Sequence, residues 1–490
     1  MNDKKRSEQD GKLVLVSNGE PYVHEKNREG YKCTKVPGGL TTGLDPLMQN
    51  EKGLWIAWGR GNDDFEIVDE NNRVKVPDEN GYTLKRIKLS DEELNGFYYG
   101  FSNETMWPIC HNFIDKANFR HNYWDTYQKV NRKYAEATLE ESSEDDMIWV
   151  HDYHLTLLPA MIRKVRENAK ISLFWHIPWP SWEAFSTLPW KHEIMEGLLA
   201  SDFIAFHTPH LASNFLTCAS RLGAEVNHGR STVIFDKHKS MVSAIPLGVD
   251  YDGLSSYSKR CMTEENCRDI KQYYHAEKLI FAVDRLDYTK GILERLMAME
   301  RFFEKYPEYI GKVTLVQRIS PSRTKVEEYR KMREEINKKI AEINGRFQID
   351  EWVPIKYFHG SVPQEELLPY FQAADIALIT PLIDGMNLVS KEYLSVKKNG
   401  ILILSEFAGA AATLKEALKV NPYNIEEVAD SIHYALEMPE DERNRRYQNL
   451  KDKVSRYDIN WWRDVFLESW ENIYDKNTED AENESISAIQ

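Results

Sequence analysis

Residues 279–300, LIFAVDRLDYTKGILERLMAME, run from an apolar segment through a polar turn into an amphipathic segment. The first five residues predict a buried strand, and residues 293–300 predict a helix. The turn between them carries Arg285 and Lys290. Arginine supplies a planar fork of N–H donors, lysine supplies a compact charge, and a helix start adds free N–H groups. The stretch therefore indicates an anion site at the end of a strand, with a surface salt-bridge cluster as the simpler alternative.

A second polar turn, DGMNLVSKE at residues 384–392, follows another apolar run at residues 374–382. The run predicts a strand, and a helix is expected from Asn387 onward because the apolar positions then recur at helical spacing. Open parallel sheets bind ligands at the carboxyl ends of their strands, and both turns are expected at such ends. The two turns therefore support each other as parts of a binding site.

The second turn adds groups that suit a sugar. Gly385 and Met386 would present backbone N–H groups at the start of the helix, and Glu392 would lie about one turn inside it. Two cations, a carboxylate and a loop of amides together indicate a nucleotide-sugar pocket. Taken alone, Glu392 is more simply interpreted as a solvated helix glutamate.

The composition predicts a globular protein with more than one domain. A chain of 490 residues is too long for one core, so two or three domains are expected. The 78 acidic residues outnumber the 63 basic ones and give a net charge of -15, which argues against a nucleic-acid partner. Anionic substrates would therefore need local basic pockets.

Nothing in the sequence predicts export or a membrane partner. Residues 1–12 are polar and charged, unlike a signal peptide, and no run approaches the roughly 18 apolar residues of a membrane span. The five cysteines lack metal-ligand spacing. Cys261 and Cys267 are close enough in sequence to pair, but reduced thiols are the simpler expectation. We expect a cytoplasmic protein.

Strands and helices alternate along the chain. Four short apolar segments that end in polar residues predict strands at residues 13–16, 147–150, 171–175 and 203–206. The first strand is expected to end in a loop at residues 17–21. The pattern begins again after residues 246–250, where Pro and Gly interrupt the chain, and residues 327–343 predict a long charged helix with a solvated face. These features predict an α/β protein with two parallel-sheet lobes.

Six further motifs accompany the two turns. They are GGL at residues 38–40, WIAW at 55–58, YYGFSN at 98–103, WP at 107–108, HDYHL at 151–155 and HIPWP at 176–180. In this order the motifs, which cover about residues 13–470, resemble the retaining glycosyltransferases of the trehalose-6-phosphate synthase family. The resemblance implies the GT-B fold: two Rossmann-like parallel-sheet lobes facing across a cleft, with a C-terminal helix crossing back to the first lobe.

The sequence and this resemblance together predict the domain boundaries. They are a polar N-terminal extension at 1–12, an acceptor-binding lobe at 13–247, a nucleotide-sugar-binding lobe at 248–458, the crossover helix at 459–477 and an acidic, disordered tail at 478–490.

The resemblance implies retaining transfer of glucose from a nucleoside-diphosphate glucose, with UDP-glucose foremost, to glucose 6-phosphate. The partners would be a nucleotide sugar and a sugar phosphate. No cofactor and no metal are expected, because lobes of this type hold the diphosphate with cations. Breaking the sugar–diphosphate bond builds negative charge on the leaving phosphate, which Arg285 and Lys290 would stabilise. The nucleotide base stays open, and so does assembly into a homo-oligomer.

The site residues follow from the matched motifs. Those assigned to catalysis are His176, Arg285, Lys290 and Asp384. Those assigned to donor binding are Gly39, Arg285, Lys290, Asp384, Gly385, Met386, Asn387, Leu388, Val389 and Glu392. Those assigned to acceptor binding are Tyr98, Trp107, Asp152 and Arg323. Asp152 and Asp384 would hold sugar hydroxyls, and would not act as the paired carboxylates of a retaining hydrolase.

One position departs from the family. An arginine that binds the acceptor phosphate is expected directly after Asn18, where this chain has Gly19. Three interpretations stay open: a catalytically impaired homologue, a phosphate held by Arg323 and a neighbour such as Arg60, or another acceptor such as glycerol 3-phosphate. An ordinary loop glycine is the simpler alternative for Gly19 itself.

Overall fold

A computed structural model provides the structure of the chain. It describes residues 11–28, 30–36, 38–261, 264–322, 327–360 and 362–487. The chain divides into two compact units, unit 1 (Met1–Pro246 with Trp462–Gln490) and unit 2 (Leu247–Trp461). Arg323, assigned above to the acceptor, lies outside the described residues, as does most of the predicted polar extension at residues 1–12.

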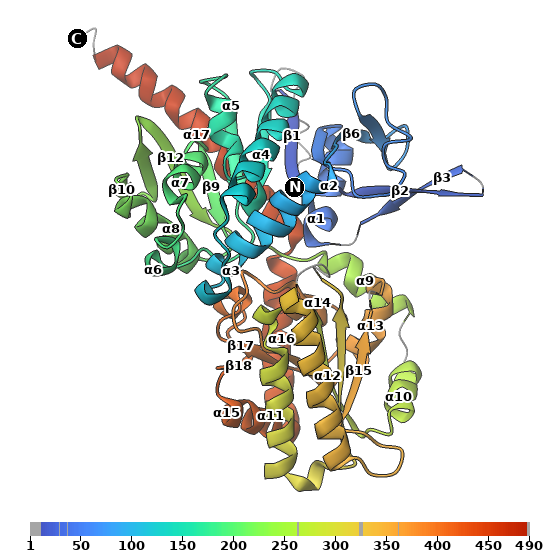
Figure 1. Cartoon of the computed structure of the whole chain (residues 1–490). Helices are drawn as coiled ribbons and strands as arrows, with labels where there is room; N and C mark the ends of the chain where they lie inside the picture. Colours follow the sequence, from blue (N-terminus) through green and yellow to red (C-terminus); the bar gives the residue numbers. More distant parts are fainter. Residues whose placement is uncertain are drawn as a thin grey trace. The chain divides into compact units, whose positions relative to one another are not determined.

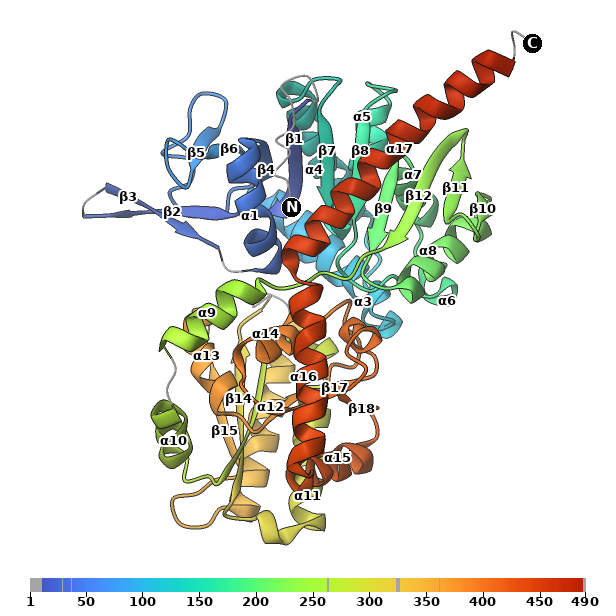
Figure 2. The ribbon, with the colours of Figure 1, turned by 180° about the vertical axis from the view of Figure 1, so that it is seen from behind.

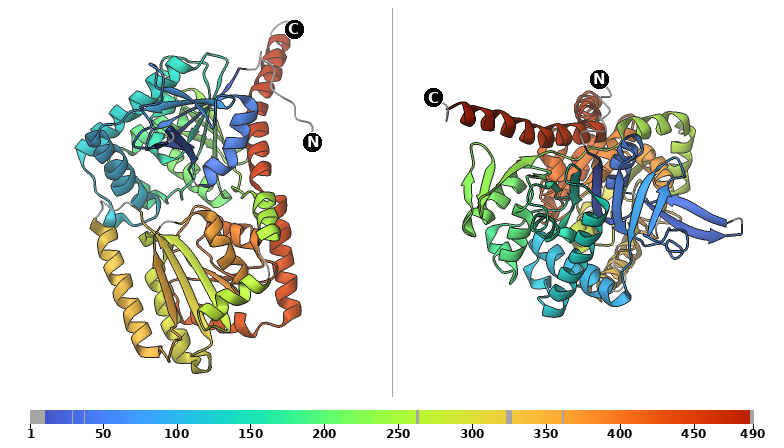
Figure 3. Two further views of the ribbon diagram at one scale, coloured as in Figure 1. Left: turned by 90° about the vertical axis from the view of Figure 1, so that its right-hand side faces the viewer. Right: turned by 90° about the horizontal axis from the view of Figure 1, so that it is seen from above.

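Unit 1 is built on a ten-stranded sheet within the described residues, in the order β10-β11-β12-β9-β8-β7-β1-β4-β6-β5 (Figure 1). Its strands, together with the separate hairpin β2–β3, are β1 (Leu13–Gly19), β2 (Tyr22–Asn27), β3 (Gly30–Lys35), β4 (Leu54–Trp58), β5 (Arg73–Val76), β6 (Tyr82–Ile87), β7 (Met147–His151), β8 (Lys170–Phe174), β9 (Phe203–Phe206), β10 (Glu225–Asn227), β11 (Thr232–Phe235) and β12 (His238–Ala244). The hairpin extends away from the sheet of this unit (Figure 3).

The helices of unit 1 connect and cover these strands. They are α1 (Gly39–Glu51), α2 (Asp91–Leu94), the π-helix η1 (Asn95–Met106), α3 (Trp107–Cys110), η2 (Ile114–Lys116), α4 (His121–Glu141), η3 (Tyr153–Leu155), α5 (Leu158–Arg163), α6 (Trp182–Phe185), α7 (Lys191–Leu199) and α8 (Pro209–Arg221).

The central strands of unit 1, from β12 to β6, all pair in parallel. The chain enters the sheet at β1 and adds strands first on one side, through β4 and β6, and then on the other, from β7 onward. The order reverses between β1 and β7, and such a switch point is where open α/β sheets bind ligands. The predicted strands at this position are confirmed, but β1 continues through Gly19 instead of ending in a loop at residue 17, because Gly19 pairs with Trp58 of β4 after a bulge.

Helix α17 (Ile459–Ser487) begins in unit 2 and belongs to unit 1 from Trp462 onward. Its side chains Trp462, Phe466 and Trp470 recur at four-residue spacing and are fully buried. Phe466 stacks on Trp149 of β7 at 4.2 Å between ring centroids, so α17 closes one face of this sheet (Figure 2).

The helix is longer than the predicted 459–477. Its backbone stays helical to Ser487, whereas the acidic composition of residues 478–490 predicts disorder. No Gly or Pro interrupts residues 459–487, so nothing in that segment forces the helix to end. Residues 488–490 lie outside the described part of the chain.

Unit 2 carries a six-stranded sheet within its described residues, in the order β15-β14-β13-β16-β17-β18, with every neighbouring pair parallel. The strands are β13 (Lys278–Arg285), β14 (Val313–Ser320), β15 (Ile355–His359), β16 (Ile376–Ile379), β17 (Ile401–Ser405) and β18 (Leu418–Val420). This is the strand order of a dinucleotide-binding sheet, and its switch point lies between β13 and β16.

The helices of unit 2 lie on both faces of this sheet. They are α9 (Tyr251–Cys261), α10 (Glu264–Tyr273), η4 (Tyr288–Lys290), α11 (Ile292–Lys305), η5 (Pro307–Tyr309), α12 (Glu327–Phe347), α13 (Gln364–Ala373), α14 (Leu388–Val396), η6 (Gly409–Ala412), α15 (Ile425–Glu437) and α16 (Glu440–Arg456). Helices α11, α12 and α15 share one apolar core with the strands, and α13, α14 and α16 share a second core on the opposite face.

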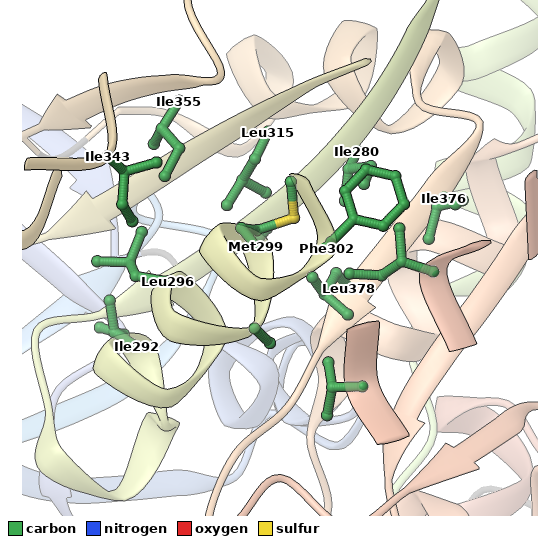
Figure 4. Close-up of a cluster of buried hydrophobic side chains, with 14 of the residues drawn as sticks. Ile280, Ile292, Leu296, Met299, Phe302, Leu315, Ile343, Ile355, Ile376 and Leu378 are labelled. Carbon is green, nitrogen blue, oxygen red and sulfur yellow. The ribbon is translucent and has the colours of Figure 1, made fainter. Parts of the chain in front are cut away.

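Figure 4 shows the first of these cores. Leu296, Met299 and Phe302 of α11 point at strand residues such as Ile280 and Leu315. Each of these side chains is fully buried. The spacing of three and four residues that predicts the helix therefore also fixes which face of it packs on the sheet. The predicted helix at 327–343 is confirmed as α12, although it is not only a solvated face, because its apolar side joins this core.

None of the helices in the described part of the chain is long and apolar enough to cross a membrane. The described cysteines with resolved side chains, Cys33, Cys110, Cys218 and Cys267, are free thiols.

We expect Phe466→Ala to lower the free energy of unfolding by about 3–5 kcal/mol, because it opens a cavity against Trp149 in a tightly packed face. Urea unfolding followed by tryptophan fluorescence measures the change. Glu468→Ala, on the exposed side of the same helix, is the control and should shift stability by at most about 0.5 kcal/mol. Equal losses in the two variants would show that α17 does not support unit 1.

Candidate active site

The turn after β13 brings the predicted phosphate-binding cations to the switch point of unit 2. Arg285 is the last residue of β13 and is exposed. Lys290 ends the short helix η4, and its Nζ lies 2.7 Å from Oδ2 of Asp384. Asn387 Nδ2 donates to the same carboxylate oxygen at 3.1 Å. A lysine of the first turn and two residues of the second are thus joined around one carboxylate.

In both turns the backbone conformation lets a helix begin at this edge of the sheet. Gly291 has φ 62° and lies so close to the carbonyl of Thr380 that a side chain there would collide with it. Asn387 has φ 76°, and its side chain accepts the N–H of Ser390 at 3.1 Å, which caps α14. The first-turn N–H groups of Leu388 and Val389 have no partner inside the helix and are suited to an anion.

The loop after β17 holds the second turn in place. Gly409 N–H donates to the carbonyl of Asp384 at 3.0 Å, and Ala410 N–H donates to the carbonyl of Met386 at 2.7 Å. A side chain on Gly409 would overlap the carbonyl of Gly385, so this close approach requires glycine. The conformation of residues 384–387 therefore depends on the loop after β17 as well as on its own sequence.

A buried arginine fastens the first turn to the sheet. Arg295 of α11 is 1% exposed. Its guanidinium donates to Asp284 Oδ2 at 2.5 Å, to Gln317 Oε1 at 2.9 Å and to Thr380 Oγ1 at 3.1 Å. It also donates to the carbonyl of Lys290 at 3.3 Å. One side chain therefore links β13, β14, the end of β16 and the turn that carries Lys290.

Two ionisable side chains of α14 have shifted pKa values. Burial raises the pKa of the Glu392 carboxyl to about 7, against the opposing effect of a hydrogen bond from Gln364 Nε2 at 2.9 Å. Burial lowers the pKa of the Lys391 ammonium to about 7, and its Nζ donates to the carbonyl of Leu247. The protonation of Glu392 near pH 7 therefore depends on the charge of a group bound beside it, whereas Lys391 donates to the backbone at the start of unit 2.

In unit 1, Asp152 and His176 meet at the ends of β7 and β8. Asp152 has φ 71° and ψ 174°, a conformation that is costly for any residue except glycine, and its Oδ1 accepts the N–H of His176 at 3.2 Å. His151 Nδ1 lies 3.0 Å from His176 Nε2, so the two rings share a hydrogen bond. Burial lowers the pKa of His176 to about 3 and that of His151 well below its usual value, so both rings are neutral at pH 7.

The predicted acceptor aromatics come from η1 and α3. The ring of Tyr98 lies 5.8 Å from that of Trp58 and stacks on His154 at 5.9 Å. Trp107 is 5% exposed and packs on His111 at 4.0 Å. Tyr98 is therefore partly open to a ligand, whereas Trp107 is mostly enclosed by protein.

Gly19 lies beside Arg60, which follows β4. A side chain on Gly19 would overlap Nη2 of Arg60 and would lie 3.0 Å from its Cζ. The guanidinium carbon is 5.5 Å from the ring of Trp58. The place of the arginine expected at position 19 is thus taken by an arginine of the adjacent strand's loop.

A buried ion cluster lies directly beneath this loop. Arg86 Nε donates to Glu20 Oε2, and its Nη2 lies near Asp64 Oδ1, both at 2.9 Å. The backbone N–H of Arg60 donates to Glu20 Oε1, and that of Gly61 donates to Asp64 Oδ2. The cluster of Glu20, Asp64 and Arg86 therefore fixes the backbone that carries Arg60.

The protonation of this cluster follows from its burial. Burial and a hydrogen bond to Asp64 raise the pKa of Glu20 to about 8, although Arg86 opposes the shift. Burial alone would raise the pKa of Asp64, but hydrogen bonds from His24 and Glu20 and the charge of Arg86 hold that pKa below its usual range. At neutral pH the cluster therefore contains one cation, one anion and one neutral acid, without net charge.

The structure groups the predicted residues unit by unit. Unit 2 brings together Arg285, Lys290, residues 384–389 and Glu392, whereas Gly39, at the start of α1, and His176 belong to unit 1. The sequence did not predict a role for Arg295 or for the acids around Arg86. A charged residue on the apolar face of the predicted helix is the only signal that could have pointed to Arg295.

Two α/β units, of which the second carries cations, a carboxylate and first-turn helix N–H groups at its switch point, define a nucleotide-sugar-dependent glycosyltransferase of the two-Rossmann type. The family model described as Glycosyltransferase family 20 matches residues 11–472, and the chain belongs to this family.

Relatives of known activity match the chain over most of its length. It is 38% identical over 469 residues to a trehalose-6-phosphate synthase of Mycolicibacterium vanbaalenii, covering 93% of this chain and 95% of that protein. It is also 38% identical to the UDP-forming alpha,alpha-trehalose-phosphate synthase of Candida albicans, covering 93% and 96%.

Two solved structures contain ligands. The E. coli protein bound with UDP-2-fluoro glucose has a TM-score of 0.85 at 32% identity, covering 94% of this chain and 98% of that one. The UDP-forming alpha,alpha-trehalose-phosphate synthase of Burkholderia xenovorans in complex with glucose-6-phosphate has a TM-score of 0.84 at 32% identity, covering 94% and 100%. The predicted family and fold class are confirmed.

The Glu20 carboxyl predicts a pH dependence of stability. The folded chain keeps this proton up to about pH 8, whereas an unfolded glutamate loses it near pH 4.3, at roughly its reference pKa. The folded state binds the extra proton between these values, so stability falls as pH rises through this window, by at most ~1.4 kcal/mol per pH unit.

Glu20→Gln should remove this slope, because the amide can donate to Asp64 at every pH. Urea unfolding at a series of pH values should show Glu20→Gln gaining on the parental chain between about pH 5 and 8. Glu25→Gln, exposed on β2, is the control and should follow the parental curve. Parallel curves for Glu20→Gln and the parent would contradict the assignment.

Proposed function

We propose that this protein transfers glucose from UDP-glucose to glucose 6-phosphate with retention, which gives trehalose 6-phosphate and UDP. The observation that carries the proposal is the cluster of Lys290, Asp384 and Asn387 beside the start of α14. It combines a cation, a carboxylate and helix N–H groups at one switch point. The relatives at 38% identity and the solved structures bound to a UDP-glucose analogue and to glucose-6-phosphate support these substrates.

In the donor, the diphosphate and the glucose would bind different groups of the same cluster. Arg285, Lys290 and the N–H groups of Leu388 and Val389 suit the diphosphate, on which negative charge grows as the glucosyl group leaves. Asp384, which accepts hydrogen bonds from Lys290 and Asn387, would bind glucose hydroxyls through its carboxylate. Glu392 would hold hydroxyls of the donor in the same way.

The acceptor would be bound by residues of unit 1. Asp152 suits the hydroxyls of glucose, and Tyr98 offers an apolar ring face that is partly open. Because His151 and His176 are neutral, they would contribute as hydrogen-bonding groups and not as cations. In the proposed reaction the leaving phosphate takes the proton of the acceptor hydroxyl, so no protein nucleophile is required.

We also place the protein in the cytoplasm. Free thiols at Cys33, Cys110, Cys218 and Cys267 support a reducing compartment. Self-association stays a prediction, which light scattering after size-exclusion chromatography can measure.

A coupled assay for nucleoside diphosphate release tests the substrates. UDP-, GDP- and ADP-glucose are each combined with glucose 6-phosphate, glucose and glycerol 3-phosphate. Fastest release is expected with UDP-glucose and glucose 6-phosphate. Faster release with glycerol 3-phosphate would make that compound the acceptor in place of glucose 6-phosphate. Absence of release in every combination would indicate a catalytically impaired homologue.

Arg285→Ala and Lys290→Ala should each lower kcat/KM by on the order of 10²-fold or more, because each removes a charge that faces the departing phosphate. Lys419→Ala, an exposed lysine on β18 of the same unit, is the matched control and should keep parental rates. Circular dichroism and thermal unfolding check that the folds are intact. Near-parental kcat/KM in both site variants would place the diphosphate elsewhere.

A further inference from the structure

The guanidinium of Arg60 occupies the space above Gly19. A Cβ on Gly19 would overlap its Nη2, and would lie 3.0 Å from Cζ and 3.6 Å from Nη1. Gly19 ends β1 and Arg60 follows β4, two neighbouring parallel strands whose carboxyl ends share one edge of the sheet. The absence of a side chain at position 19 is therefore what lets a cation from the next strand lie there.

Arg60 is exposed, and within the described residues its guanidinium forms no ion pair with a carboxylate. The chain as a whole has a net charge of -15, so an anionic ligand depends on local cations such as this one. An arginine that is not neutralised by the protein keeps its fork of N–H donors for a phosphate or carboxylate of a ligand.

The backbone of Arg60 is nevertheless held firmly. Its N–H donates to the buried Glu20, and the next N–H, of Gly61, donates to the buried Asp64. Both carboxyls are in turn bound by Arg86, which is 1% exposed. A buried ionic cluster that fixes an exposed, unneutralised arginine is the arrangement expected of a preorganised binding group.

Neighbouring groups point to a polar ligand at the same edge. Asn18, directly before Gly19, is 5% exposed, and its Oδ1 has no hydrogen-bond partner in the described structure. A buried amide oxygen without a donor is costly, and a ligand hydroxyl would satisfy it. The ring of Trp58 contacts both neighbours. Its centroid lies 5.5 Å from the guanidinium carbon of Arg60 and 5.8 Å from the ring centroid of Tyr98.

We propose that Arg60 binds the phosphate of the acceptor, in the role that the family resemblance assigns to an arginine at position 19. The proposal rests on the function proposed above. A Cβ at position 19 would displace the guanidinium of Arg60 from its present position. In this proposal the phosphate-binding group has moved from the end of β1 to the loop after β4. Gly19 is then a consequence of this exchange and not a sign of impairment.

The first test compares glucose 6-phosphate with glucose as acceptor. Arg60→Ala should raise KM for glucose 6-phosphate about ten- to a hundredfold, because one charge-assisted contact is lost. KM for UDP-glucose and turnover with glucose should stay near parental values. Arg60→Lys should recover part of the phosphate preference, since it keeps the charge but not the fork. Arg230→Ala, an exposed arginine elsewhere in unit 1, controls for net charge.

The second test moves the arginine back. Gly19→Arg alone should give no gain in phosphate preference, because the new side chain takes the place of a guanidinium that already lies there and displaces it. The double variant Gly19→Arg with Arg60→Gly should recover most of the preference that Arg60→Gly loses. Gain from Gly19→Arg alone, or a double variant no better than Arg60→Gly, would overturn the exchange.

Calorimetric titration of glucose 6-phosphate and of glucose provides a readout that does not depend on turnover. The parental chain should bind the phosphorylated sugar more tightly, and Arg60→Ala should remove most of that difference. If the parental chain binds glucose 6-phosphate but forms no disaccharide, the result contradicts the proposed function but not the proposed phosphate site. If Arg60→Ala keeps the parental difference in binding, or the parental chain shows none, the proposal for Arg60 is wrong.

Discussion

The buried guanidinium of Arg295 is the contact on which the site of unit 2 depends. It donates to Asp284 of β13, to Gln317 of β14, to Thr380 directly after β16 and to the carbonyl of Lys290. A charge removed from water in this way is costly unless its donors are satisfied, and these acceptors take four of its five N–H groups. The position of the turn is therefore tied to the sheet, because a shift of the turn would take the Lys290 carbonyl away from a buried guanidinium N–H.

In unit 1 a buried arginine also fixes a loop, here the loop that carries Arg60. Arg86 is buried with Glu20 and Asp64, and the two carboxyls take the N–H groups of Arg60 and Gly61. Buried ion clusters contribute little net stability compared with well-packed apolar side chains, so their value here is in fixing geometry. In both units a buried arginine holds a short loop at the carboxyl end of a strand, and that loop carries an exposed or half-exposed cation. The loop lies at the switch point in unit 2 and follows β4, beside β1, in unit 1.

The sequence predicts what local patterns determine. Apolar runs located the strands, and the helical spacing after Asn387 located α14, because both follow from short-range periodicity. The role of Arg295 could not be predicted, since one arginine in an amphipathic segment is normally solvent-exposed. The strained backbone of Asp152 and the overlap of Arg60 with Gly19 arise from contacts between strands distant in sequence, which no local pattern encodes.

Lys290 and Arg60 differ in whether the protein pairs their charge with an acid, and this difference fits the ligand that each would bind. Lys290 is already paired with Asp384, so a diphosphate that takes the lysine releases lone pairs of Asp384, which sugar hydroxyls can satisfy. Recognition of phosphate and of sugar is thereby coupled, as a nucleotide sugar requires. Within the described residues Arg60 has no such carboxylate, so a ligand can bind it without displacing an acid. That arrangement suits a simple phosphate monoester at the edge of β1 and β4.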